Sequence, residues 1–136
     1  MKPIQCRCPR CVAMCTKGAC VPTPAEALAL IKAGYASRLA TYQPFIGSTE
    51  QAVVAPAVVG AEGGTRQRTD GRCTFHSADG KCELHATGLK PLEGRIAHHT
   101  RDWIAVRMHV NARWSDAKFN TVREELKNAR LQQAAA

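Results

Sequence analysis

The sequence predicts a mainly α protein with irregular metal-bound loops, folded as one small domain over residues 1–136. Three observations predict this class. Apolar residues recur with helical spacing in the last third of the chain, a capping box opens a helix near residue 24, and the cysteines fall in two groups without helical period. The length suits one modest core and not two. We divide the domain into a cysteine cluster at 1–22, a second ligand group at 72–99 and C-terminal helices at 100–131.

The first helix is expected over about residues 24–33. Residues 23–26, Thr-Pro-Ala-Glu, form a capping box with Thr at the N-cap, Pro at N1 and Glu at N3. Gly34 suits the position just past the helix end. The expected apolar face consists of Ala27, Leu28, Leu30 and Ile31. A short second helix is expected over residues 35–42, with Leu39 pointing inward.

The rest of the chain separates into an extended and a helical part. Glycines and prolines interrupt residues 43–65, where Val53 and Val54 favour one or two short strands. The helical period returns after Thr100 and predicts helices at about 100–112 and 116–131. Their expected inward side chains are Trp103, Val106, Val110, Trp114, Phe119, Val122 and Leu126. Arg123, Glu124, Glu125, Lys127 and Arg130 are expected to face water.

Five of the seven cysteines lie in the first twenty residues, as C-x-C-x2-C-x3-C-x4-C. They are Cys6, Cys8, Cys11, Cys15 and Cys20. This segment has few large apolar side chains, so hydrophobic burial cannot order it. Thiolate–metal bonds supply such energy, and C-x2-C lets two sulfurs of one turn reach a single tetrahedral ion. The cluster therefore predicts a metal site.

The second cysteine group consists of two C-x2-H pairs, Cys73-Thr-Phe-His76 and Cys82-Glu-Leu-His85. Asp79-Gly80 between them is typical of a hairpin turn. Short paired extended segments are therefore expected here, with Cys73 opposite Cys82. Residues 88–95 are expected to form a loop that leads to two further histidines, His98 and His99.

Candidate ligands outnumber the four that one tetrahedral site needs. The economical first set is Cys8, Cys11, Cys73 and Cys82, two close pairs brought together from far apart. Cys15 and Cys20 come next, followed by His85, with Cys6 and His98 behind them. His76, His99 and His109 complete the possible donors. Such a site suits zinc, and we favour it over iron or an iron–sulfur cluster, which the spacing also permits.

The charge balance adds a second possible partner. Lys and Arg number 19 against 11 Asp and Glu, a formal net charge of +8, which four thiolates around each zinc would lower by about two. The basic loops suggest nucleic acid as a partner, through Arg7, Arg10, Lys17, Arg66, Arg68 and Arg72. The first residues lack an apolar signal region and no apolar run suits a membrane span, so a cytoplasmic protein without membrane contact is expected.

The order of these motifs resembles the zinc- or iron-chelating domain family, whose members carry a CxxCxxCC-like cysteine cluster followed by G-x-C and G-x-C-x-(I/L)-(Y/H) segments. The resemblance covers about residues 6–99. It implies that Cys8, Cys11, Cys15, Cys73 and Cys82 occupy the family's cysteine positions. This chain has Gly94-Arg95 where the family often has Cys-Arg, so Cys20, His85 or His98 would have to replace that ligand. Similar short chains occur among phage and prophage genes.

The resemblance supports metal binding and leaves the reaction open. The first hypothesis is a small metal-binding protein with a mainly structural zinc site. The alternatives are a metalloenzyme or redox protein with an iron–sulfur or open site, and a metal-stabilised nucleic-acid-binding module. A catalytic cysteine is the weaker interpretation, because it calls for one activated thiol in a cleft and not for a row of five.

Overall fold

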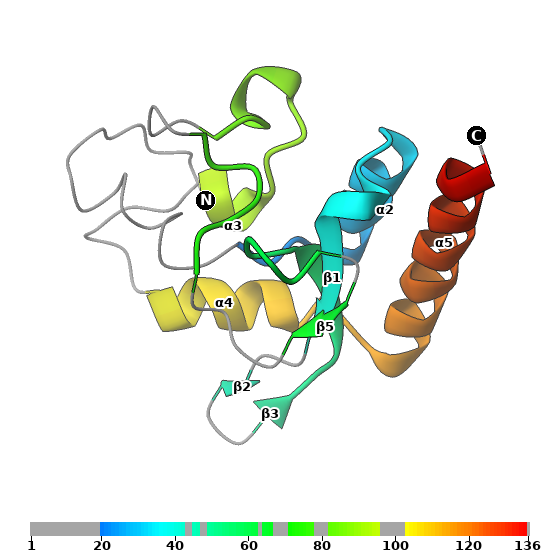
Figure 1. Cartoon of the computed structure of the whole chain (residues 1–136). Helices are drawn as coiled ribbons and strands as arrows, with labels where there is room; N and C mark the ends of the chain where they lie inside the picture. Colours follow the sequence, from blue (N-terminus) through cyan, green and yellow to red (C-terminus); the bar gives the residue numbers. More distant parts are fainter. Residues whose placement is uncertain are drawn as a thin grey trace.

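The computed structural model describes residues 20–42, 45–46, 49–62, 64–66, 71–77, 82–95 and 103–135. Three long helices and two four-residue strands organise this part: α2 (Pro24–Lys32), β1 (Leu39–Tyr42), β4 (Val53–Pro56), α4 (Trp103–Asn111) and α5 (Asp116–Ala135). In Figure 1, α2 and α5 lie on one side of β1, and α4 lies on the other. The smaller elements are η1 (Ala36–Arg38), β2 (Phe45–Ile46), β3 (Thr49–Glu50), β5 (Thr65–Arg66), η2 (His85–Thr87) and α3 (Leu92–Arg95).

Helix α2 confirms the expectation from the capping box. The backbone N–H of Glu26 donates to Thr23 Oγ1 at 3.3 Å, and the Thr23 N–H donates to Glu26 Oε1 at 2.9 Å. At the other end Gly34 has φ +97°, and the N–H groups of Gly34 and Tyr35 donate to the carbonyls of Ile31 and Leu30. This left-handed closure satisfies the last helical carbonyls. The helix buries Ala27, Leu30 and Ile31.

The expectation of a helix over residues 35–42 was wrong. Only the single turn η1 is helical, and the chain then enters β1, which pairs antiparallel with β4 from Leu39 opposite Pro56 to Tyr42 opposite Val53. β5 adds a short parallel edge to β1, and β2 pairs with β3. The pairing with β4 buries Leu39, Ala40 and Tyr42, so tertiary contacts override the local preference. Leu39 does point inward, as expected.

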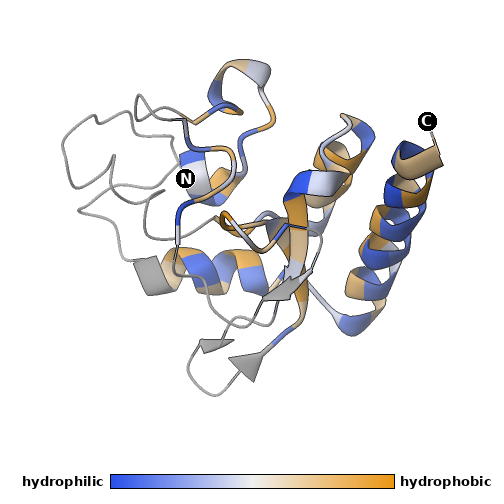
Figure 2. Cartoon of the chain, viewed as in Figure 1, coloured by the Kyte–Doolittle hydropathy of each residue, from blue (hydrophilic) through white to orange (hydrophobic). Residues whose placement is uncertain are grey.

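The two C-terminal helices supply the rest of the core. Val106 and Val110 of α4 and Val122 and Leu126 of α5 are buried, as their spacing predicts, and Trp114 between the helices is buried as well. Figure 2 shows apolar and polar residues alternating around α5. This helix ends at Ala135, four residues beyond the expected end. No helix in the described residues is long and apolar enough to cross a membrane.

Arg130 departs from its expected place in water. Its guanidinium donates to the carbonyls of Ala36, at 3.3 Å, and Leu39, at 2.7 Å. These carbonyls lie at η1 and the start of β1, so the contact ties the end of α5 to the sheet. Partial burial lowers the pKa of Arg130 below its usual value.

Residues 92–95 form helix α3 and not the expected loop, because two carboxylates hold it. Glu26 of the capping box accepts from the Leu92 N–H at 2.7 Å through its second oxygen. Glu93, which is 0% exposed, receives two hydrogen bonds of 2.8 Å from Arg107 of α4. Arg107 also donates to the Tyr42 hydroxyl at 3.1 Å. This buried ion pair joins α3, α4 and β1.

Candidate metal centre

The two C-x2-H pairs each fold into a tight four-residue turn. The His76 N–H donates to the Cys73 carbonyl at 3.0 Å, and the His85 N–H donates to the Cys82 carbonyl at 3.1 Å. We call these segments, residues 73–76 and 82–85, the paired Cys–His turns. A tight turn of this kind keeps its first and last side chains near each other, as metal-binding turns require.

The two turns are joined to one another through their backbones. His76 pairs antiparallel with Cys82, and the Glu83 N–H donates to the Phe75 carbonyl at 2.7 Å. Cys73 pairs with Val58, so the expectation that Cys73 lies opposite Cys82 was wrong. Residues 73–76 close into a turn of their own, and the pairing with the second segment therefore begins at His76. The expected hairpin turn at Asp79-Gly80 lies outside the described residues.

The second and third positions of the two turns have matching environments. Phe75 and Leu84 occupy the third position, and both side chains are buried in the core. Full burial of such a side chain contributes about 1.5–3 kcal/mol, so these two anchor the turns to the helical part. The second position, Thr74 or Glu83, faces Arg38 in both turns.

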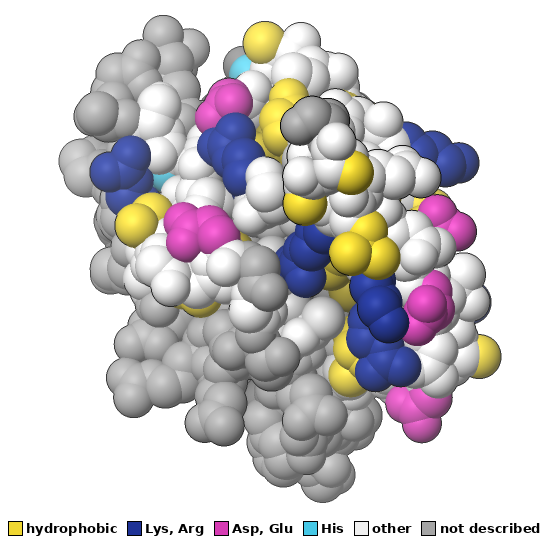
Figure 3. All heavy atoms as spheres, turned by 45° about the vertical axis from the view of Figure 1, so that its right-hand side comes forward, with side chains coloured by type: hydrophobic (Ala, Val, Ile, Leu, Met, Phe, Trp, Pro, Cys, Tyr) yellow, Lys and Arg dark blue, Asp and Glu magenta, His cyan; other side chains and the backbone are white. Residues whose placement is uncertain are grey.

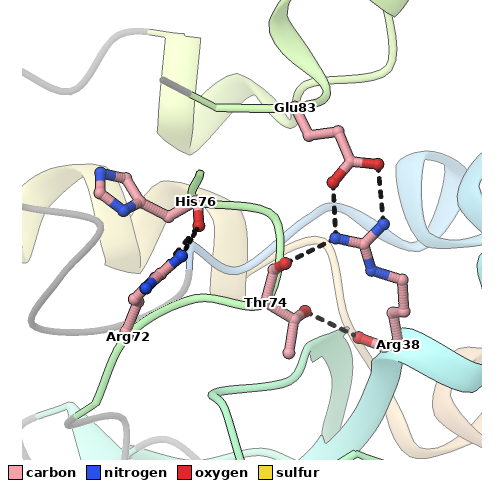
Figure 4. A network of polar contacts seen from close by, with 5 residues as sticks. All are labelled: Arg38, Arg72, Thr74, His76 and Glu83. Carbon is pink, nitrogen blue, oxygen red and sulfur yellow. Dashed lines mark hydrogen bonds and ion pairs between the residues drawn. The ribbon is translucent and has the colours of Figure 1, made fainter. Parts of the chain in front are cut away.

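Arg38 of η1 holds both turns with one guanidinium (Figure 4). Its Nη1 and Nη2 donate to the two carboxylate oxygens of Glu83 at 2.9 and 2.7 Å, and Nη2 also donates to the Thr74 carbonyl. The guanidinium carbon lies 4.1 Å from the centre of the Phe75 ring. The hydrogen bond from Arg38 lowers the pKa of Glu83 and raises that of Arg38. Sequence reasoning missed this residue, because its partners are 36 and 45 positions away.

His76 is the unusual side chain of the paired Cys–His turns. It is 8% exposed, and both ring nitrogens are buried without a hydrogen-bond partner among the described residues. Its carbonyl accepts from Arg72 at 2.7 and 3.1 Å, and Figure 4 shows the ring turned away from the Arg38–Glu83 pair. A buried polar group without a partner costs about 1–3 kcal/mol. His85, in the matching position, is exposed.

Cys20 lies at a different place, beside α3. Its Sγ is 3.5 Å from where a Cβ on Gly94 would stand. The chain just after it is fixed by two contacts. The Val21 N–H donates to Glu93 at 2.9 Å, and the Trp114 indole donates to the Pro22 carbonyl at 2.8 Å. Burial acts to lower the pKa of Arg107. The hydrogen bonds and the attraction to Glu93 outweigh it and raise that pKa overall, and Cys20 adds a small contribution in the same direction.

The remaining expected ligands are placed as follows. Cys73 is buried in the apolar core, Cys82 is half-buried against it, and His85 begins η2. Within the described part of the chain, no group of three or more His, Cys, Asp or Glu side chains is positioned to hold a metal ion. Cys6, Cys8, Cys11, Cys15 and His98 lie outside the described residues. The described residues by themselves therefore contain no complete tetrahedral set of ligands.

Of the basic residues expected to contact nucleic acid, Arg7, Arg10, Lys17 and Arg68 and the side chain of Arg66 lie outside what the structure describes. Among those whose side chains are described is Arg72, and its guanidinium is hydrogen-bonded to the His76 carbonyl. On the face shown in Figure 3, Lys and Arg side chains lie among Asp and Glu side chains and form no continuous basic stripe within the described part. Phosphate binding would instead favour a patch of one sign.

Comparison of the chain with protein-family models, with curated proteins and with solved structures finds no match. The resemblance drawn from the ordered cysteine motifs therefore stays a prediction. Of the three residues considered as replacements for the cysteine expected near Gly94, Cys20 lies against that glycine.

Proposed function

We propose that this chain is a small metal-binding protein whose cysteine-rich zinc site is mainly structural. The observation that carries the proposal is the pair of Cys–His turns, joined through His76 and Cys82 and held by Arg38. Two tight turns, each with a thiol at one end and an imidazole at the other, offer donors that zinc prefers. Their backbones are held before any metal binds, which reduces the entropy lost on binding.

The proposed ligands come from both cysteine groups. The first set is Cys8, Cys11, Cys73 and Cys82, with Cys15 and Cys20 as further thiols. Cys20 gains support from its place beside Gly94, where the resembling family has a cysteine. Four protein ligands close a tetrahedral site and leave no position for substrate, so the metal would stabilise the fold and perform no reaction. Such a site would bring residues 1–22 together with residues 72–85.

Elemental analysis of the anaerobically purified full-length chain tests the proposal. We expect zinc in a fixed ratio to protein and no visible absorbance. Replacing Cys8, Cys11 or Cys82 by Ser should remove most of the metal and lower thermal stability, because each change deletes a strong thiolate bond. Cys6→Ser is the matched control, since the resemblance assigns no family cysteine position to Cys6.

Three outcomes would change the proposal. A chain without bound metal after anaerobic purification and zinc titration would overturn it. Visible absorbance with iron and acid-labile sulfide would replace the structural zinc site by an iron–sulfur cluster. Equal metal loss in Cys6→Ser and Cys8→Ser would indicate a larger, polynuclear site.

A further inference from the structure

We propose that His76 is a nitrogen ligand of the metal, so that the site holds one imidazole beside its thiolates. The inference rests on the proposed function and deepens it, because it assigns a donor that the cysteine pattern alone does not select. It starts from the most unusual buried group of the described residues. His76 is 8% exposed, and neither Nδ1 nor Nε2 has a hydrogen-bond partner within the described part of the chain.

A neutral imidazole has one N–H donor and one acceptor nitrogen, and a buried ring normally satisfies at least one of them. Core histidines do so with a carbonyl, a hydroxyl or a carboxylate. His76 has none of these among the described residues, although its own carbonyl is bound by Arg72. A metal ion is a partner that would occupy one nitrogen and need no protein acceptor.

The position of His76 opposite Cys82 would let these two residues bind one metal ion as a pair of ligands. His76 and Cys82 are directly opposite each other in an antiparallel pairing. Side chains of such opposed residues leave the backbone on the same face, with their Cβ atoms roughly 4.5–5.5 Å apart. That separation lets a thiolate and an imidazole reach one ion. Cys73 belongs to the apolar core, so we infer that His76 replaces Cys73 of the first ligand set as the ligand from the first turn.

The chain contains its own comparison for this assignment. His85 closes the second turn as His76 closes the first, and its N–H makes the same backbone hydrogen bond. However, His85 is exposed and His76 is buried. The environments differ although the local sequence pattern is the same. His85 therefore serves as the matched control for every substitution at position 76.

The test uses the full-length chain reconstituted anaerobically with Co²⁺, which takes the place of zinc and reports its ligands by absorption. The wild type should show tetrahedral cobalt bands with thiolate charge transfer from three sulfurs. His76→Cys should keep the metal and raise the charge-transfer intensity to that of four thiolates. His76→Leu should lower cobalt and zinc affinity by about tenfold or more. His85→Leu should retain the wild-type affinity.

Each result decides for or against the inference. If His76→Leu and His76→Cys match the wild type in affinity and spectrum, His76 is a core histidine that bonds to water, and the zinc proposal stands without it. If the wild type binds neither cobalt nor zinc, both proposals fail. An unfolded His76→Leu chain beside a folded His76→Cys chain with four-thiolate cobalt supports ligation. Loss of folding in both variants, with and without metal, assigns His76 a packing role only.

Discussion

The helical core and the paired Cys–His turns are stabilised by different interactions. The core is stabilised by the apolar side chains that α2, β1, β4 and α5 bury. The capping box of α2 and the backbone pairing of β1 with β4 add hydrogen bonds. The turns bury only Phe75 and Leu84 as large anchors and are held by hydrogen bonds from two arginines, Arg38 and Arg72. They also contain the ring of His76, which has no hydrogen-bond partner among the described residues. The apolar core is therefore stabilised by its own packing, whereas the turns retain a cost of burying His76 that a metal bound to one ring nitrogen would reduce.

Metal removal should separate the two regions most strongly. We expect a strong chelator to expose residues 1–22 and 72–85 to protease together, while α5 stays protected, because the proposed ligands come from both segments. Structural zinc contributes about 10–16 kcal/mol in zinc-finger peptides, more than any single side chain here. Limited proteolysis with mass spectrometry, before and after chelation, measures the change. Unchanged cleavage in both segments would rule out a shared site.

Glu93→Ala should cause the largest loss among single core substitutions. It leaves Arg107 buried without its counter-ion and the Val21 N–H without its acceptor. Breaking a buried pair in this way costs about 3–5 kcal/mol. Urea unfolding measures the loss. The double variant Glu93→Leu/Arg107→Met is the control, since it removes both charges and should cost less than the two single changes combined.

Leu126→Ala tests the apolar side alone. Leu126 is buried where α5 contributes to the core, and its truncation should lower the free energy of unfolding by about 2–5 kcal/mol. Metal bound per folded chain should not change, because the turns keep their contacts. Leu131→Ala on the same helix is the control, since Leu131 is 61% exposed and its loss should change stability by less than about 0.5 kcal/mol. If folded Leu126→Ala also lost metal, the apolar core and the paired Cys–His turns would not be independent.

Glu83→Gln should have the smallest effect, under about 1 kcal/mol at pH 7, because the Arg38–Glu83 pair is partly exposed to solvent, which screens the attraction. Arg38 lowers the pKa of Glu83 in the folded protein. The ion pair therefore stabilises the fold above the unfolded-state pKa of about 4.3, and this contribution disappears as the pH falls through the lower folded pKa. The free energies of unfolding of the wild type and of Glu83→Gln, measured in urea from pH 7 to pH 3, should become equal as the pH falls. Glu124→Gln, exposed on α5, is the control.

The sequence by itself determined the elements that depend on neighbouring residues. The capping box and Gly34 place both ends of α2, and apolar spacing identifies Val106, Val110, Val122 and Leu126 as buried. These features follow from local hydrogen bonding and from the helical period, which act within a few residues. The C-x2-H pattern likewise predicted paired extended segments here, but the register was wrong, because His76 and not Cys73 lies opposite Cys82.

Only the tertiary structure decided the contacts between distant segments. β1 formed where a helix was expected because β4 supplies its hydrogen bonds, and α3 formed because Glu26 and Arg107 reach it from other helices. Two histidines in the same C-x2-H pattern ended in opposite environments, His76 buried and His85 exposed. The local pattern sets the turn, but burial depends on which segments cover it, and that is a property of the whole fold.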